Sequence, residues 1–155
     1  MDISQILEEQ DDEALLLNVV AHITAKQDFD IDSIPEVEKN VVAVITAQTI
    51  IDNRGFKYFF ESDFSSTPDY QLFVDAYRAI GAEESAQGIT QALAFFPDNV
   101  PPVDANERQK HLAAIFDSAD DHSQQISVHE GKIAGNEQNY AKAAAYIRNN
   151  KQAFT

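Results

Sequence analysis

The sequence has 155 residues, which is enough for one domain with its own hydrophobic core. It has no cysteine, which excludes disulfides, thiol catalysis and thiolate zinc sites and fits a reducing cytosol. Its 26 acidic and 11 basic residues give a net charge of −15, and a field of that sign repels nucleic acids and anionic membranes.

The chain carries no recognisable signal for export or membrane insertion. Its start, MDISQILEEQDDEA, is acidic where a signal peptide needs a basic segment and then an apolar run. The longest apolar runs, such as residues 41–45, are far shorter than the roughly 20 residues of a membrane helix. We therefore expect a soluble cytoplasmic protein that folds as a single domain over residues 1–155.

The first predicted element is an acidic helix over residues 2–25, with Asp2 as its N-cap. The acids at positions 8–13 would form i,i+4 pairs of like charge on it, and each pair destabilises a helix by a few tenths of a kcal/mol. They lie beyond the first turn, so the helix dipole is not expected to account for them. Apolar residues recur in this helix at steps of three and four: Ile3, Ile6, Leu7, Leu17, Val20 and Ile23.

A second helix is predicted from near Ser33 to residue 51, with Pro35 at an allowed early position. The β-branched run VVAVITAQTII also suits a strand, which is the alternative for this segment. The helical interpretation places five apolar side chains on one face: Val37, Val41, Val44, Ile45 and Ile51.

An Asn-Arg-Gly break, in which the glycine frees the backbone, separates this helix from a short aromatic one. Phe56, Phe59 and Phe60 recur at three and four residues and therefore share one helical face. We interpret these rings as part of the core. The alternative is a groove for a partner or ligand, in which Lys57 and Tyr58 would be the residues off the apolar face.

Two helices are predicted next, in close succession. Thr67 caps the first, which has Pro68 in its first turn and ends at Gly81. The second covers about residues 86–96. The loop 97–103 contains three of the five prolines and is predicted to have no regular structure.

The remaining part of the chain completes an all-α prediction. Asp104 caps a helix, residues 118–135 are polar and weakly patterned, and a last helix begins near Asn136. Phe154 is expected to dock just beyond that helix. The whole chain is predicted to be a compact all-α domain of six or seven helices.

Sequence motifs for catalysis are absent. No G-x-S-x-G elbow, Walker loop or H-E-x-x-H helix occurs. Asp121, His122 and His129 offer carboxylate and imidazole ligands for a divalent ion, but their spacing matches no defined site. A small metal-dependent enzyme is therefore the least favoured alternative.

A calcium site is also excluded. The acids at positions 28, 30 and 32 imitate the start of an EF-hand loop, which then requires glycine at its sixth position and glutamate at its twelfth. Ser33 and Lys39 stand at those positions. We therefore expect no catalytic residue, no metal and no cofactor.

The uneven distribution of charge is the most informative feature. Residues 1–38 carry a net charge of −10, residues 39–80 carry −1 and residues 81–155 carry −4. An array of carboxylates can bind the lysines and arginines with which a protein contacts DNA phosphates, so these acids can form a binding surface. The alternative is that the acids only increase solubility. The candidate partner-binding residues are Glu8, Glu9, Asp11, Asp12, Glu13, Asp28, Asp30, Asp32, Glu36 and Glu38.

Residues 53–60, Asn-Arg-Gly-Phe-Lys-Tyr-Phe-Phe, resemble the N-G-G-F-x-Q-Y-F signature of the DNA mimic protein family, a group of small bacterial all-α proteins. AYRAIGAEESAQGITQALAFFP at residues 76–97 and AAYIRNNKQAF at residues 144–154 look like further stretches of that family, so the resemblance covers about residues 36–155. Arg54, Tyr58 and Phe59 depart from the signature, and Tyr58 replaces its polar glutamine. The residues that match, mainly structural in role, are Asn53, Gly55, Phe56 and Phe60.

The resemblance implies an all-α fold, no catalytic activity, and binding to a DNA-binding protein through an acidic surface. We therefore expect a non-enzymatic protein that occupies the nucleic-acid site of a basic partner, such as a DNA-binding transcription regulator, and that binds neither nucleic acid nor membrane itself. A shape-specific interaction module of the antidote or immunity type is the second hypothesis. The oligomeric state stays open, with a homodimer among the possibilities.

Overall fold

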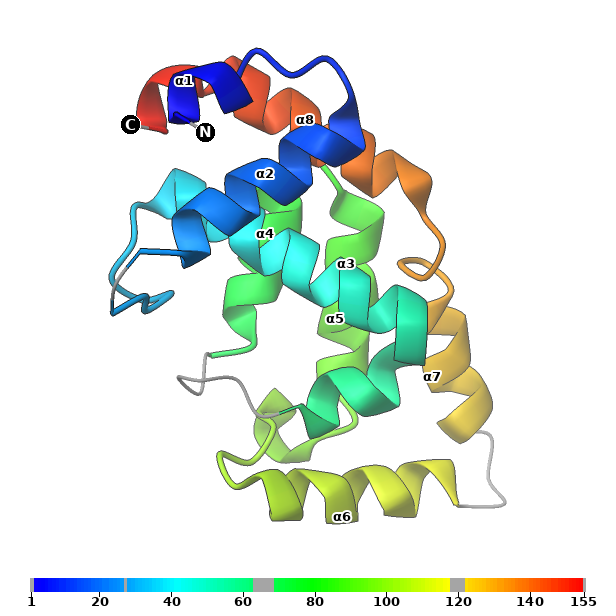
Figure 1. Cartoon of the computed structure of the whole chain (residues 1–155). Helices are drawn as coiled ribbons and strands as arrows, with labels where there is room; N and C mark the ends of the chain where they lie inside the picture. The colour runs from blue at the N-terminus through cyan, green and yellow to red at the C-terminus, as the bar shows by residue number, and fades with distance from the viewer. Residues whose placement is uncertain (1, 27, 63–68, 118–121, 155) are drawn as a thin grey trace.

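The computed structural model describes residues 2–26, 28–62, 69–117 and 122–154, which form helices joined by short connections (Figure 1). This part of the chain contains eight α-helices, two 3₁₀ turns and no strand, which confirms the all-α prediction. The predicted six or seven helices are too few because the N-terminal helix is divided and because a helix lies in the weakly patterned region 118–135.

The acidic N-terminus is not the continuous helix predicted over residues 2–25. It forms α1 (Ile3–Ile6) and α2 (Asp12–Thr24), and Asp11 takes the extended backbone of an N-cap between them, with φ −75° and ψ 124°. The break removes the i,i+4 repulsion of the continuous helix and puts Asp12 and Glu13 in the first turn of α2, where the helix dipole stabilises acids. The prediction that the dipole does not account for these two acids is therefore wrong.

The long helix α3 (Glu36–Glu61) contains the β-branched run, so the strand alternative is wrong. Pro35 occupies its N-cap position. The predicted break occurs inside this helix at Gly55, whose φ of 73° and ψ of −174° are not helical. The predicted apolar face turns inward, because Val41, Val44 and Ile51 are each at most 2% exposed.

Helices α4 (Gln71–Ala79) and α5 (Glu83–Leu93) follow and pack on each other. Gly81 lies between them with φ +84°, a conformation that favours glycine, so the predicted helix stop is confirmed. Thr67 and Pro68, the predicted start of the first of these helices, lie outside the described residues.

The C-terminal half consists of the turn η1 (Pro97–Asn99), then α6 (Ala105–Phe116), α7 (His122–Glu130), α8 (Glu137–Asn149) and the turn η2 (Lys151–Ala153). The predicted Asp104 cap is confirmed, because its side chain accepts a hydrogen bond from the Glu107 N–H at 3.0 Å. The last helix begins where predicted, and Asn136 caps it by accepting a hydrogen bond from the Gln138 N–H at 3.2 Å. The prediction of no regular structure over 97–103 is wrong at η1. The prediction for 118–135 missed α7, which has no apolar stripe of helical period to reveal it.

A single hydrophobic cluster draws side chains from all eight α-helices. Phe56, Phe59 and Phe60 lie in it with no exposed surface, and the centroids of the Phe59 and Phe73 rings are 5.0 Å apart. The interpretation of these rings as core is therefore confirmed. Phe154 is 2% exposed and packs into the same cluster, as predicted.

The arrangement of the helices sets the position of the acidic N-terminus. In Figure 1, α2 lies at one end of the molecule against α8 and α3, and α6 closes the opposite end. Within the described ranges, no helix is long and apolar enough to cross a bilayer.

Candidate functional site

The structure separates the predicted acidic residues into two groups at opposite ends of α2. The corner group comprises Glu8, Glu9, Asp11, Asp12 and Glu13, at the turn from α1 into α2. The loop group comprises Asp28, Asp30, Asp32 and Glu36, between the end of α2 and the first turn of α3. Because α2 has 13 residues, the groups lie about 20 Å apart at the rise of an α-helix.

Glu38, the tenth predicted residue, does not belong to an exposed surface. It is 3% exposed, and its carboxylate accepts two hydrogen bonds from the Lys26 ammonium, at 3.1 and 3.2 Å. It lies in the first turn of α3, and this ion pair joins α3 to the end of α2, where Lys26 lies. The prediction of a partner-binding role for Glu38 is therefore corrected: it joins two elements of the fold.

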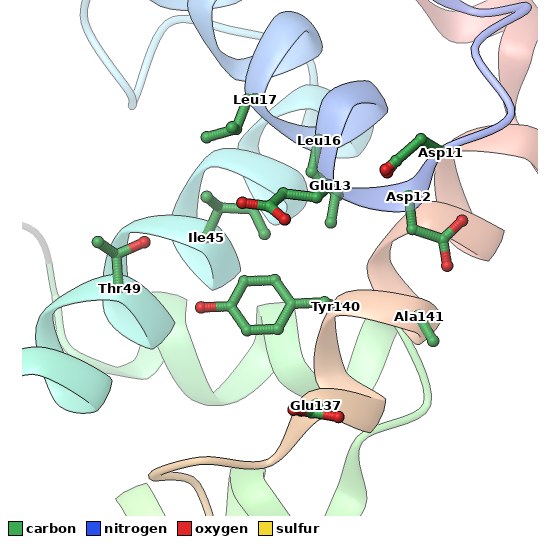
Figure 2. A pocket seen from close by; sticks show the side chains of 10 residues that line it. All are labelled: Asp11, Asp12, Glu13, Leu16, Leu17, Ile45, Thr49, Glu137, Tyr140 and Ala141. Carbon is green, nitrogen blue, oxygen red and sulfur yellow. The ribbon is translucent and has the colours of Figure 1, made fainter.

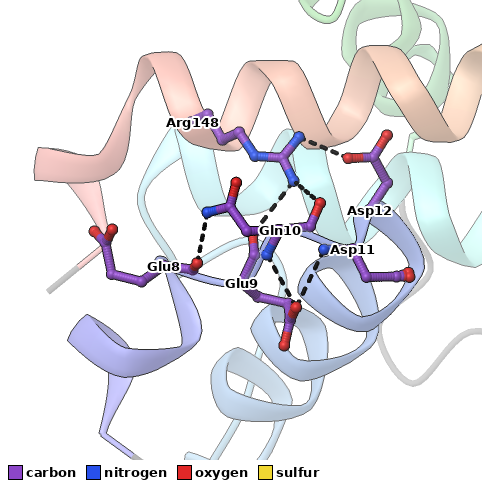
Figure 3. Close-up of polar contacts among 6 residues, drawn as sticks. All are labelled: Glu8, Glu9, Gln10, Asp11, Asp12 and Arg148. Carbon is purple, nitrogen blue, oxygen red and sulfur yellow. Dashed lines mark hydrogen bonds and ion pairs between the residues drawn. The ribbon is translucent and has the colours of Figure 1, made fainter.

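Arg148 of α8 holds the corner group in place (Figure 3). Its guanidinium donates to Asp12 Oδ1 at 2.6 Å and to the backbone carbonyls of Glu9 and Gln10 at 3.3 and 3.1 Å. The Glu9 carboxylate in turn accepts from the backbone N–H groups of Gln10 and Asp11. The non-helical backbone between α1 and α2 thus has polar partners, as a turn of this kind requires.

The corner group retains carboxylates that no cation among the described residues offsets. Lys151 of η2 pairs with Glu8 at 2.7 Å, and Arg148 pairs with Asp12. Asp11 and Glu13 are exposed, and neither forms an ion pair within the described part of the chain.

A groove of about 610 Å³ opens beside these two carboxylates, between α2, α3 and α8 (Figure 2). Its carboxylates are those of Asp11, the N-cap residue of α2, of Asp12 and Glu13 in α2, and of Glu137 in α8. Its apolar lining comprises Leu16, Leu17, Ile45, Tyr140 and Ala141. Among the described residues that line it, none is a lysine, arginine or histidine.

The Tyr140 ring is fixed from behind by a hydrogen-bond network. Its hydroxyl donates to Asp52 Oδ2 at 2.8 Å, and Asp52 Oδ1 accepts from the Gln48 side chain and from the Gly135 N–H. Burial, followed by the bond to Asp52, raises the pKa of Tyr140 well above its usual range. Tyr140 therefore presents a neutral ring, held in one orientation, to the groove.

The loop group has the chemistry expected of an exposed anionic loop. Asp28 has a positive φ of 60°, Asp30 Oδ1 accepts from the Asp32 N–H at 3.1 Å, and Glu36 lies in the first turn of α3. All four side chains are exposed. Both groups belong to the set of acids proposed from the sequence as partner-binding residues, and α2 separates them.

Glu137, Tyr140 and Arg148 are the residues that sequence reasoning missed. They belong to α8, which is more than 100 positions from the corner group. Nothing local in the sequence joins the two segments, because their contact arises only from the packing of α2 on α8. Glu137 follows the Asn136 cap and looks from the sequence like an ordinary first-turn acid.

The signature residues have structural positions. Asn53 donates to the Thr49 carbonyl of its own helix at 2.7 Å, and Gly55 supplies the break in α3. Beyond the break, the N–H of Phe56 donates to Glu130 Oε2 of α7 at 3.0 Å. Off the buried face, Tyr58 is 41% exposed, and the Arg54 guanidinium carbon lies 4.6 Å from the centroid of its ring; Tyr58 is not among the residues that line the groove between α2, α3 and α8.

Of the three residues of the alternative metal site, only His129 has a described side chain. Asp121 lies outside the described residues, and the side chain of His122 is not described either. Burial, followed by the charge of Lys132, lowers the pKa of His129. Among the described residues, no three His, Asp or Glu side chains gather as metal ligands would.

Comparison with known proteins identifies the family of this chain. A family model described as DMP19-like protein matches residues 32–150, which confirms the resemblance to the DNA mimic family over most of the chain. No curated protein and no solved structure matches. The matched region contains Asp32 and Glu36 of the loop group and all of α8, whereas the corner group precedes it.

Proposed function

Because this chain belongs to the DMP19-like protein family, we propose that it is a non-enzymatic binding protein whose exposed carboxylates occupy the nucleic-acid site of a basic DNA-binding protein. The partner we propose is a DNA-binding transcription regulator. In the complex, carboxylates would replace phosphates as the groups that its lysines and arginines contact.

One observation carries this proposal: both ends of α2 present exposed carboxylates that form no ion pair within the described residues. Asp11 and Glu13 do so at one end, and Asp28, Asp32 and Glu36 do so at the other. These acids belong to the segment 1–38, whose net charge is −10. Two separated groups of like charge suit a partner with cations spread along an extended surface, as DNA-binding proteins have.

The proposal is tested by competition with DNA. Duplex DNA is immobilised and loaded with the basic DNA-binding proteins of the native cell extract, and the purified protein is then added. We expect it to release one of them. Its affinity for the released protein, measured after purification of that protein, should fall by at least about tenfold between low and physiological salt, because the contacts are ionic.

Two matched variants separate a specific surface from general charge. Asp28→Asn, Asp32→Asn and Glu36→Gln together remove three charges from the loop group. Asp98→Asn, Glu84→Gln and Glu107→Gln remove three exposed charges elsewhere, and Asp98 matches Asp28 in its positive φ. We expect the first variant to lose most of the competition and the second to keep it.

If the two variants competed with DNA equally well, the loop-group acids would serve solubility and not a specific contact. If a protein were released and its affinity changed neither with the two variants nor with salt, the shape-specific interaction module would be favoured instead. Failure to release any DNA-bound protein at low salt would contradict the proposed function itself.

A further inference from the structure

We propose that the groove between α2, α3 and α8 is a receptor for arginine or lysine side chains of the basic partner, an inference that rests on the proposed function. The hydrocarbon stems would lie on the apolar lining, and the charged ends would meet Asp11, Glu13 and Glu137.

The apolar lining is the first step toward this assignment. Leu16 and Ile45 are buried, at 2% and 7% exposure, and form the floor, whereas Leu17 is 58% exposed at the side of the groove. A leucine exposed to this extent leaves apolar surface in water, and contact with another apolar group would remove it. The fixed ring of Tyr140 continues this surface across the groove (Figure 2).

The carboxylates are the second step. Glu13 and Glu137 lie on opposite sides of the Tyr140 ring in Figure 2, one from α2 and one from α8. Asp12 also lines the groove, but its charge is offset by Arg148 at 2.6 Å. Three carboxylates without a cation partner in the described chain therefore surround an apolar surface: Asp11, Glu13 and Glu137.

The combination of apolar surface and carboxylates determines which kind of side chain fits the groove. A lysine or arginine side chain has a hydrocarbon stem that packs on apolar surface and a charged end that needs an anion, so it satisfies both parts of the groove at once. An anionic ligand would be repelled, and a purely apolar one would leave the carboxylates desolvated without a partner. The volume of about 610 Å³ lies within the range of ligand pockets and leaves room for more than one such side chain.

The groove would thus recognise more than charge. A phosphate backbone offers a basic protein only its anionic oxygens and sugar edges, whereas this site also offers apolar surface for the stems.

The test uses two short synthetic peptides that carry equal charge at the assay pH of about 5.5, where both kinds of basic side chain are protonated and exposed carboxylates stay ionised. One contains arginines separated by alanines, and the other contains diaminopropionate, a cation with a single methylene, in place of arginine. Binding is followed by the backbone amide shifts of the full-length protein. We expect the arginine peptide to shift Leu16, Leu17, Tyr140 and Ala141, and to bind roughly fivefold to tenfold more tightly than the diaminopropionate peptide.

Two variants with matched controls complete the test. Leu17→Gln, which changes no charge and replaces an exposed side chain, should remove the preference for arginine. Glu137→Gln should weaken binding of the arginine peptide about fivefold more than Glu84→Gln, which also removes an exposed acid from the first turn of a helix, here α5.

Equal affinity for the two peptides, or equal effects of Glu137→Gln and Glu84→Gln, would overturn the groove assignment. If the protein still displaced a DNA-bound partner in that case, the proposed function would stand and only the groove would fail. If wild-type protein displaced nothing from DNA, the proposed function would fail whatever the peptides showed.

Discussion

At the scale of single residues, Gly55 explains why the signature stretch begins with a break. A Cβ atom at this position would lie 2.8 Å from one oxygen of the Glu130 carboxylate and 2.9 Å from the other, and the φ of +73° is itself unfavourable for other residues. The same carboxylate accepts the N–H of Phe56, the first residue after the break. Glycine therefore permits both the turn and the cap.

Gly55→Ala should destabilise the protein by about 2–3 kcal/mol, because it adds backbone strain and displaces Glu130. Gly81→Ala is the matched control: Gly81 has a similar φ of +84°, but a Cβ there would meet no atom within 4 Å. Its cost should be only about 1 kcal/mol. Urea unfolding of both variants checks this, and equal losses of stability would show that Glu130 contributes nothing.

The residue scale also shows what the sequence could predict. The break at Gly55 and the burial of Phe56, Phe59 and Phe60 follow from a glycine and from three- and four-residue spacing, which are local signals. Glu130 could not be predicted, because it lies 74 positions from Phe56 in a helix without an apolar stripe. Long-range polar contacts of this kind leave no periodicity in a sequence.

At the scale of elements, the corner between α1 and α2 depends on α8. The continuous helix 2–25 was a reasonable prediction from apolar spacing, but charge repulsion and the hydrogen bonds of Arg148 favour a turn at residues 8–11. The local sequence therefore draws attention to the acids at positions 8–13, but it predicts neither the backbone turn that carries them nor the groove, because the groove is formed by α2, α3 and α8 together.

Arg148→Gln should loosen the corner group. We expect a loss of about 1–2 kcal/mol in stability, since a half-buried guanidinium loses an ion pair and two carbonyl acceptors, and faster hydrogen exchange at residues 9–12.

Lys151→Gln is the control for this prediction, because it also removes one positive charge near the corner group. Its partner Glu8 is 72% exposed, so the pair should contribute at most about 0.5 kcal/mol. If exchange at residues 9–12 rose equally in both variants, charge rather than the Arg148 contacts would hold the turn.

At the scale of the whole molecule, the fold carries a net charge of −15, most of it from residues 1–38. Like charges at this density oppose the compact state through mutual repulsion. The hydrophobic cluster that joins all eight described α-helices must offset this repulsion.

Added sodium chloride should therefore raise the melting temperature at neutral pH, by roughly 3–5 °C between low and moderate salt, because the ions screen the repulsion. Calorimetry at fixed pH measures this. The variant lacking three loop-group charges should show a smaller rise. A melting temperature that falls with salt would mean that the ion pairs, such as Lys26–Glu38 and Arg148–Asp12, outweigh the repulsion.

Two acids of the corner group already have a counter-ion within the protein, because Arg148 pairs with Asp12 and Lys151 pairs with Glu8. A partner cation that reached either carboxylate would displace a side chain, which stays attached to the protein, so no small ion would enter the solution. The slope of log affinity against log salt should therefore report fewer ions than there are carboxylates in contact. DNA has no covalently attached cations, so the ions that a DNA-binding protein displaces from it enter the solution. Binding of the partner to this protein should therefore release fewer small ions than binding of the same partner to DNA.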